Sequence, residues 1–81
     1  MTTENLSQRV IELIADEFQI PIHTIREDSR IIDDLGLDSF GLINLIARFE
    51  EEFHIKLSDD SLTRIKTVHD AAEFLQTLIP A

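Results

Sequence analysis

The middle of the chain reads DDLGLDSFGLINLIARFEEEF, residues 33–53, and this stretch decides the fold. Its apolar residues recur at the spacing of one helix face: Leu42, Leu45, Ile46, Phe49 and Phe53. At about 100° per residue these side chains cluster on one side of a helix. Asp38 precedes them and is a residue type favoured as a helix N-cap. The sequence therefore predicts an amphipathic helix over residues 39–53.

A first helix is predicted over residues 5–18, where apolar side chains again recur at helical spacing. Pro21 ends it, because proline cannot continue a helix. Residues 20–37 then form a connection that is unusually long for a compact domain unless it packs or has a function. We expect it to pack across the helices, with a helical turn around 24–27, through Ile20, Ile22, Ile25, Ile31, Ile32 and Leu35.

Two shorter helices are predicted in the last third of the chain. Ser58-Asp59-Asp60 is a cap signal for a helix over 59–65. Thr67 and Asp70 have the spacing of a capping box, which opens a last helix over 68–78. The β-branched residues do not alternate, so no sheet is expected. We predict a single all-α domain over residues 1–81, a four-helix bundle with a long first loop and a short third helix.

Charge and length restrict the possible functions. The chain has 81 residues, 16 acidic against 7 basic side chains, and a formal net charge of −9. Nucleic acid and anionic membranes are unfavourable partners for such a chain, because both require a basic face. Between residues 27 and 60 there are ten acidic and three basic residues. Basic protein surfaces are therefore the expected partners.

Several kinds of chemistry lack the residues they need. Cysteine is absent, which excludes a disulfide framework, a thiolate metal site and a cysteine nucleophile. His23, His54 and His69 have neither metal-ligand spacing nor a paired nucleophile, and residues 33–36 lack the oxygen pattern of a calcium loop. We expect no metal and no catalytic activity. The N-terminus does not resemble a signal peptide and no apolar run is long enough to span a membrane, so we expect a cytoplasmic protein.

Residues 33–40 lead directly into the helix over 39–53 and resemble the signature of the acyl carrier protein family, Asp-Leu-Gly-x-Asp-Ser-Leu. A Glu-Glu-Glu-Phe run at residues 50–53 follows at the family's distance from the serine. Lys66-Thr67-Val68 opens the last helix, as it does in the family. The resemblance covers essentially the whole chain.

The resemblance implies that Ser39 is the attachment point of 4'-phosphopantetheine, installed from coenzyme A by a phosphopantetheinyl transferase. The first turn of a helix suits a phosphate, because its free N–H groups and positive dipole end favour an anion. The resemblance gives Asp38 a role in recognition by the transferase. Gly36 is expected to supply a backbone conformation closed to other residues, or to let the transferase approach. The imported arm would carry acyl groups as thioesters.

The helix over 39–53 departs from the family in ways that concern its partners. Phe40 replaces the usual leucine after the serine, and Gly41 and Asn44 stand where acids are common. Phe40, Ile43 and Ala47 point away from the core stripe and are expected to form an apolar docking face, unless the first loop covers them. Glu50 and Glu51 are expected to contact basic enzymes. Gly41 suggests close approach of the arm or a partner, or simple drift.

Three readings of function remain open. The first is a discrete, monomeric acyl carrier for fatty acid, polyketide or specialised lipid biosynthesis. The second is a carrier of aminoacyl or peptidyl groups, although such carriers more often have Gly-Gly-x-Ser-Leu at the serine. The third is an acidic helical adaptor without a prosthetic group, for which Ser39 would be only a capping residue.

Overall fold

The chain is helical in a computed structural model that describes residues 3–57 and 61–79. Its elements are α1 (Thr3–Phe18), the 3-10 turn η1 (Ile22–Thr24), α2 (Ser39–Phe53), α3 (Ser61–Arg64) and α4 (Val68–Leu78). Over the described ranges no strand forms, and one isolated antiparallel bridge joins Arg30 to Thr67. The predicted all-helical class is confirmed. Three helices are long, whereas α3 is a single turn.

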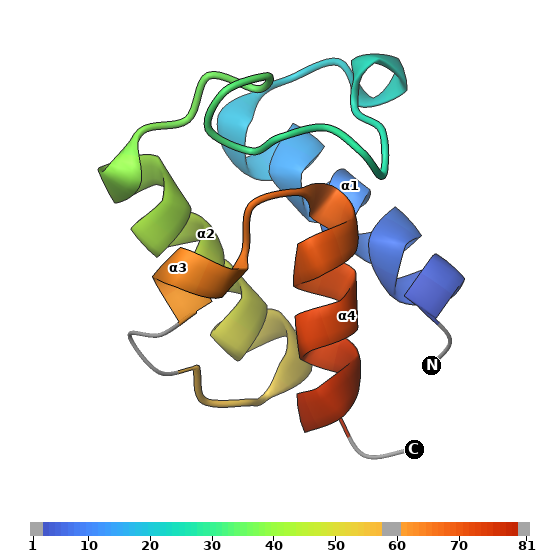
Figure 1. The fold of residues 1–81 in the computed structure, drawn as a ribbon, viewed down its shortest axis with the longest axis vertical. Helices are drawn as coiled ribbons and strands as arrows, with labels where there is room; N and C mark the ends of the chain where they lie inside the picture. Colours follow the sequence, from blue (N-terminus) through green and yellow to red (C-terminus); the bar gives the residue numbers. More distant parts are fainter. Residues whose placement is uncertain (1–2, 58–60, 80–81) are drawn as a thin grey trace.

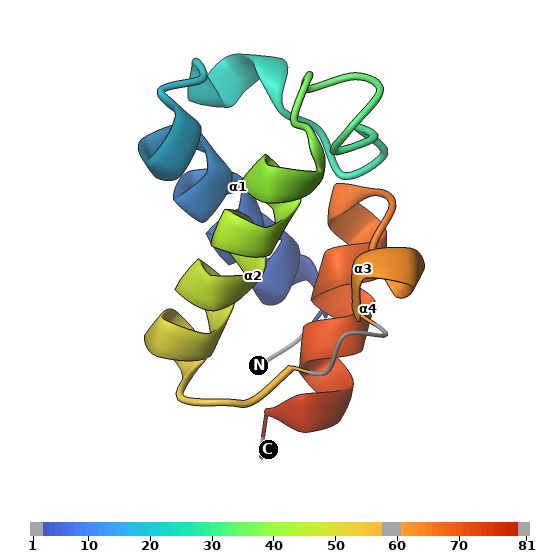
Figure 2. The ribbon, with the colours of Figure 1, turned by 90° about the vertical axis from the view of Figure 1, so that its left-hand side faces the viewer.

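The three long helices surround one core, and the connection between α1 and α2 crosses one end of it (Figures 1 and 2). α1 packs most extensively against α4. The core is aliphatic apart from Phe49, which is fully buried. The helices bury one face each, as their apolar spacing predicts. The buried apolar residues are Leu6, Val10, Ile11, Leu13, Ile14, Ile25, Ile31, Leu37, Leu42, Leu45, Ile46, Phe49, Ile65, Val68, Ala71, Ala72 and Leu75.

The observed helix bounds match the predicted ones for two helices and differ for the other elements. α2 and α4 begin and end at the predicted residues. α1 begins at Thr3 rather than at residue 5. The helical turn predicted around 24–27 is wrong by about one turn, because η1 begins directly after Pro21, whose φ of −57° already suits a helical turn. The predicted start of the third helix at residues 59–60 lies outside the described residues, and its observed end is Arg64.

The loop over residues 20–37 is fastened to the start of α4 by backbone hydrogen bonds. The N–H of Ile31 donates to the carbonyl of Lys66 at 2.9 Å. The expectation that the loop packs on the helices is confirmed by Ile25 and Ile31, which belong to the loop and are buried in the core. Ile22 and Ile32 do not share in this packing, because they are 45% and 46% exposed.

Candidate functional site

Asp38 ends the loop and begins α2. Its backbone is extended, with φ −97° and ψ −174°, and its carboxylate accepts the N–H of Gly41 at 2.7 Å. Its carbonyl accepts the N–H of Leu42 at 3.0 Å, which closes the first helical turn. The predicted N-cap role of Asp38 is confirmed. The following residue is therefore held at the first position of the helix.

Ser39 is that first residue, and its side chain is exposed. Over the described part of the chain, no hydrogen bond engages its hydroxyl. The backbone N–H groups of Ser39 and Phe40 are also without partners there. Free N–H groups at the positive end of a helix attract an anion. A phosphate joined to the Ser39 hydroxyl would meet these donors with no side chain to displace.

The start of α4 is also capped, but unlike at the start of α2 its first backbone N–H groups have partners. Thr67 and Asp70 form the predicted capping box, with the Asp70 N–H donating to Thr67 Oγ1 at 3.1 Å. The N–H of Val68 donates to the carbonyl of Ser29 at 3.1 Å, and that of His69 to the carbonyl of Glu27 at 2.8 Å. The loop thus occupies the α4 donors and leaves those of α2 open to solvent.

The two glycines near Ser39 have different structural roles. Gly36 has φ +78°, and a Cβ built there meets nothing within 4 Å. Its backbone conformation, rather than crowding, therefore requires glycine, as one of the two sequence-based interpretations held. At Gly41 a Cβ would lie 3.3 Å from Leu37 Cγ. The buried Leu37 side chain thus packs close to the α2 backbone at Gly41, which has no side chain of its own.

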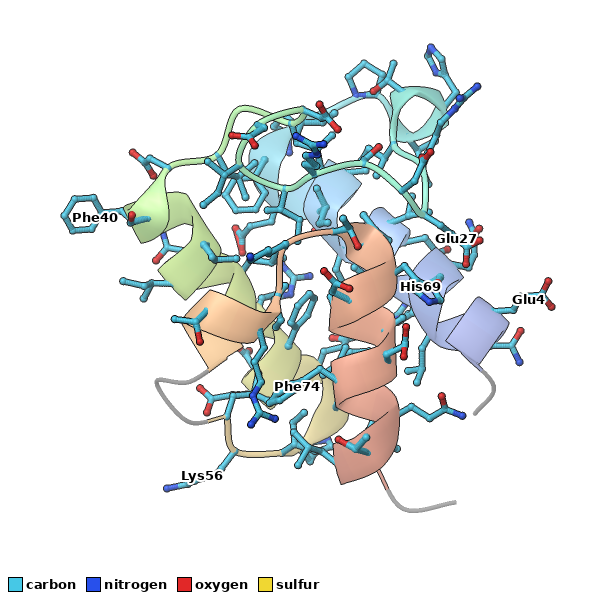
Figure 3. The ribbon with its side chains drawn as sticks, viewed as in Figure 1. Glu4, Glu27, Phe40, Lys56, His69 and Phe74 are labelled. Carbon is cyan, nitrogen blue, oxygen red and sulfur yellow. The ribbon has the colours of Figure 1, made fainter. Side chains whose placement is uncertain are left out.

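An apolar strip on α2 begins beside Ser39. Phe40 is 77% and Ile43 48% exposed, and Ala47 is exposed one turn further on. Phe40 projects outward from the start of α2 (Figure 3). The alternative that the first loop covers Phe40 and Ile43 is therefore wrong. The strip is continuous with the serine along one face of the helix.

The three acids that end α2 differ in what they contact, although the sequence presents them as one run. Glu50 accepts the backbone N–H of Leu57 at 2.8 Å and closes the turn that follows the helix. Glu52 forms an ion pair with Arg9 of α1. Glu51 is exposed and has no partner among the described residues. These pairings were not predicted, since no local pattern in the sequence indicates them.

A cavity of about 420 Å³ adjoins the first turn of α2. Phe18 and Ile20 line it from the end of α1 and the residues after it, and Phe40, Gly41 and Asn44 line it from α2. The loop residues Leu35, Gly36, Leu37 and Asp38 complete it. The residues predicted for the attachment site, Gly36, Asp38 and Ser39, therefore lie together at one end of the bundle.

Within the described part of the chain, no helix is long and apolar enough to cross a membrane. No group of three histidine, cysteine, aspartate or glutamate side chains in residues 3–57 and 61–79 is placed to hold a metal ion.

The structure thus places an exposed serine on the open N-terminus of a helix, directly after an aspartate cap. A family model described as "Phosphopantetheine attachment site" matches residues 8–75. The acyl carrier proteins of Rickettsia canadensis (strain McKiel) and Rickettsia rickettsii (strain Iowa) are each 37% identical over 75 residues, which is 93% of this chain and 87% of theirs. The chain belongs to the acyl carrier protein family. The predicted family and its covalent prosthetic group, 4'-phosphopantetheine, are confirmed.

Proposed function

We propose that Ser39 carries the 4'-phosphopantetheine arm. The observation that supports this most directly is the exposed, unengaged hydroxyl at the first residue of α2, beside two backbone N–H groups without partners in the described chain. Asp38 holds this turn in place through Gly41. The arm supplies a terminal thiol, which forms thioesters with acyl groups and which a chain without cysteine cannot provide itself.

The function that follows is that of an acyl carrier protein without catalytic activity of its own, working in the cytoplasm as a monomer. α3 serves as the fourth and shortest helix of its bundle. The first turn of α2 contains no acidic residue, which favours a specialised lipid or polyketide pathway over general fatty acid synthesis. The strongly acidic chain favours acyl over aminoacyl cargo.

We infer two parts to its partner surface. A phosphopantetheinyl transferase would meet Asp38 and approach past the open space at Gly36. Acyl-loading and acyl-transferring enzymes would meet the apolar strip of Phe40, Ile43 and Ala47, with their basic groups facing Glu51 and Glu50. Because the Glu50 carboxylate is already engaged by Leu57, Glu51 is the stronger candidate of the two acids.

Intact-protein mass spectrometry tests the attachment residue. The unmodified chain, Ser39→Ala and Ser29→Ala would be incubated with coenzyme A and a broad-specificity transferase. The wild type and Ser29→Ala should each gain one phosphopantetheinyl group, whereas Ser39→Ala should gain none. Circular dichroism would establish that all three are folded. Modification of Ser39→Ala would overturn the assignment, and failure of the wild type with a second, cognate transferase would favour the adaptor.

A further inference from the structure

A cavity of about 400 Å³ lies at the N-terminal half of α1, away from the attachment serine. The loop contributes Glu27 to its wall, and α1 contributes Glu4, Asn5, Ser7, Gln8 and Ile11. In Figure 3, Glu4 and Glu27 lie at the edge of the molecule opposite Phe40. The cavity is therefore formed by surfaces that the carrier function described above does not use.

Ser7 is the residue of this cavity that most favours a bound ligand. Its side chain is 2% exposed, and its Oγ atom has no hydrogen-bond partner. Buried hydroxyls are nearly always paired, because leaving one unpaired costs free energy that water would otherwise recover. Since Ser7 lines the cavity, a polar group bound there would provide the missing partner.

The charges around the cavity define the ligand. No ion pair or hydrogen bond of the described structure engages the carboxylates of Glu4 and Glu27, whereas Glu12 and Glu52 are both paired with Arg9. Ionised carboxylates only accept hydrogen bonds, so a ligand must donate. The positive end of the α1 dipole amounts to roughly half a charge, which two carboxylates outweigh. The site is thus anionic.

Two carboxylates are too few to favour a divalent cation, and no cluster of three potential metal-ligating side chains occurs in the described residues. A guanidinium group suits the site better, since it offers several N–H donors in one plane and is only weakly hydrated. We propose that this cavity binds an arginine side chain of a partner protein. It would give the carrier a second docking surface, on the side opposite the apolar strip of α2. This inference does not depend on Ser39 being the attachment residue.

An NMR titration of the ¹⁵N-labelled full chain tests the proposal with two small probes. N-acetylarginine methylamide should produce saturable shifts of the backbone amides of Ser7, Gln8 and Glu27. N-acetylcitrulline methylamide has nearly the same shape without the charge, and at equal salt it should leave these amides unshifted. Absence of a saturable arginine-specific response at these amides would overturn the proposal.

Matched variants separate specific binding from general attraction to an acidic protein. Glu27→Gln should weaken binding by up to about fivefold, as for a partly exposed charge pair. Asp33→Asn also removes one negative charge, at an exposed loop side chain outside this cavity, and should leave the affinity unchanged. Equal weakening by both variants would mean that the probe follows only net charge, and would contradict the proposal.

Ser7→Ala tests whether the buried hydroxyl contacts the ligand. It should weaken arginine binding without lowering the urea midpoint of unfolding, because no hydrogen bond of the free protein is lost. Unchanged affinity would show that Ser7 takes no part and would remove the main support for the site. Glu27→Gln should still accept phosphopantetheine. The mass assay therefore tests Ser39 and the titration tests the cavity, and either proposal can fail while the other holds.

Discussion

The guanidinium of Arg48 lies 3.3 Å from the carboxylate of Asp16, and this contact joins the middle of α2 to the last turn of α1. A second contact, at 3.4 Å, joins Arg48 to Glu17. Arg48 is the only basic residue of α2, and its charge is balanced by its own protein. Arg48 and Glu51 are three positions apart and so are neighbours on the helix surface, but the charge of Arg48 is already compensated by Asp16 and Glu17.

Replacing Arg48 by methionine should lower the free energy of unfolding by about 0.5–1 kcal/mol, because partly exposed ion pairs contribute little. Urea denaturation would measure the loss. The difference from wild type should shrink in about 1 M salt, since screening weakens such pairs. Arg26→Met is the control, because Arg26 is exposed and its guanidinium is unpaired in the described structure. A larger loss that persists in salt would mean that the aliphatic part of Arg48 is the main contribution.

Two phenylalanines of α2 allow a matched test of the core. Phe49 is fully buried and Phe40 is 77% exposed. Phe49→Ala should cost about 3–5 kcal/mol, because it leaves a cavity, and could unfold so small a domain. Phe40→Ala should change the free energy of unfolding by less than about 0.5 kcal/mol. Urea melts of both variants check this, and similar losses would contradict the orientation of α2.

Asp38→Ala should lower the free energy of unfolding by about 0.5–2 kcal/mol, because the Gly41 N–H loses its capping partner. Asp38→Asn should keep most of the stability, since asparagine is also a good N-cap. Both variants lack the carboxylate charge. If the transferase recognises that charge, the rate of phosphopantetheine transfer should fall in both; a normal rate for Asp38→Asn would show that the cap alone matters.

Gly36→Ala should lower the free energy of unfolding by about 1–2 kcal/mol, the cost of placing a Cβ in the left-handed region. The space around Gly36 is open, so this cost comes from the backbone and not from a clash. Gly36→Asn should lose less, because asparagine tolerates this conformation better. Chemical denaturation would compare the two, and equal losses would show that bulk at this position matters more than backbone conformation.

The parts of the fold that were predictable from the sequence are those with local causes. α2 and α4 start where Asp38 and Thr67 cap them, and both caps lie within three residues of the N–H groups they bind. The apolar spacing of each long helix indicates its buried face. Gly36 and Ser39 lie on the same short segment, so the proposed attachment site could be described from local sequence alone.

The remaining features depend on residues that meet only in the folded chain. Nothing local indicates that Glu52 pairs with Arg9 or that Glu50 closes a turn with Leu57. The cavity beside Ser7 is of the same kind, because Glu27 comes from the loop. One signal was present: Ser7 precedes Val10 by three positions and so lies on the buried side of α1, where a hydroxyl is unusual.

The hydrogen bonds from the start of α4 to the loop also constrain the order of folding. The loop carbonyls of Glu27 and Ser29 find their donors only when His69 and Val68 are present in a formed helical turn. On a ribosome, α1, the loop and α2 would emerge first and could not complete their packing. Bringing the loop and the start of α4 together costs conformational entropy, and the contacts that offset this cost form only afterwards. The loop that leads into Ser39 should therefore be among the last parts of a newly made molecule to become ordered, and a transferase that acts at Ser39 should prefer chains from which α4 has already emerged.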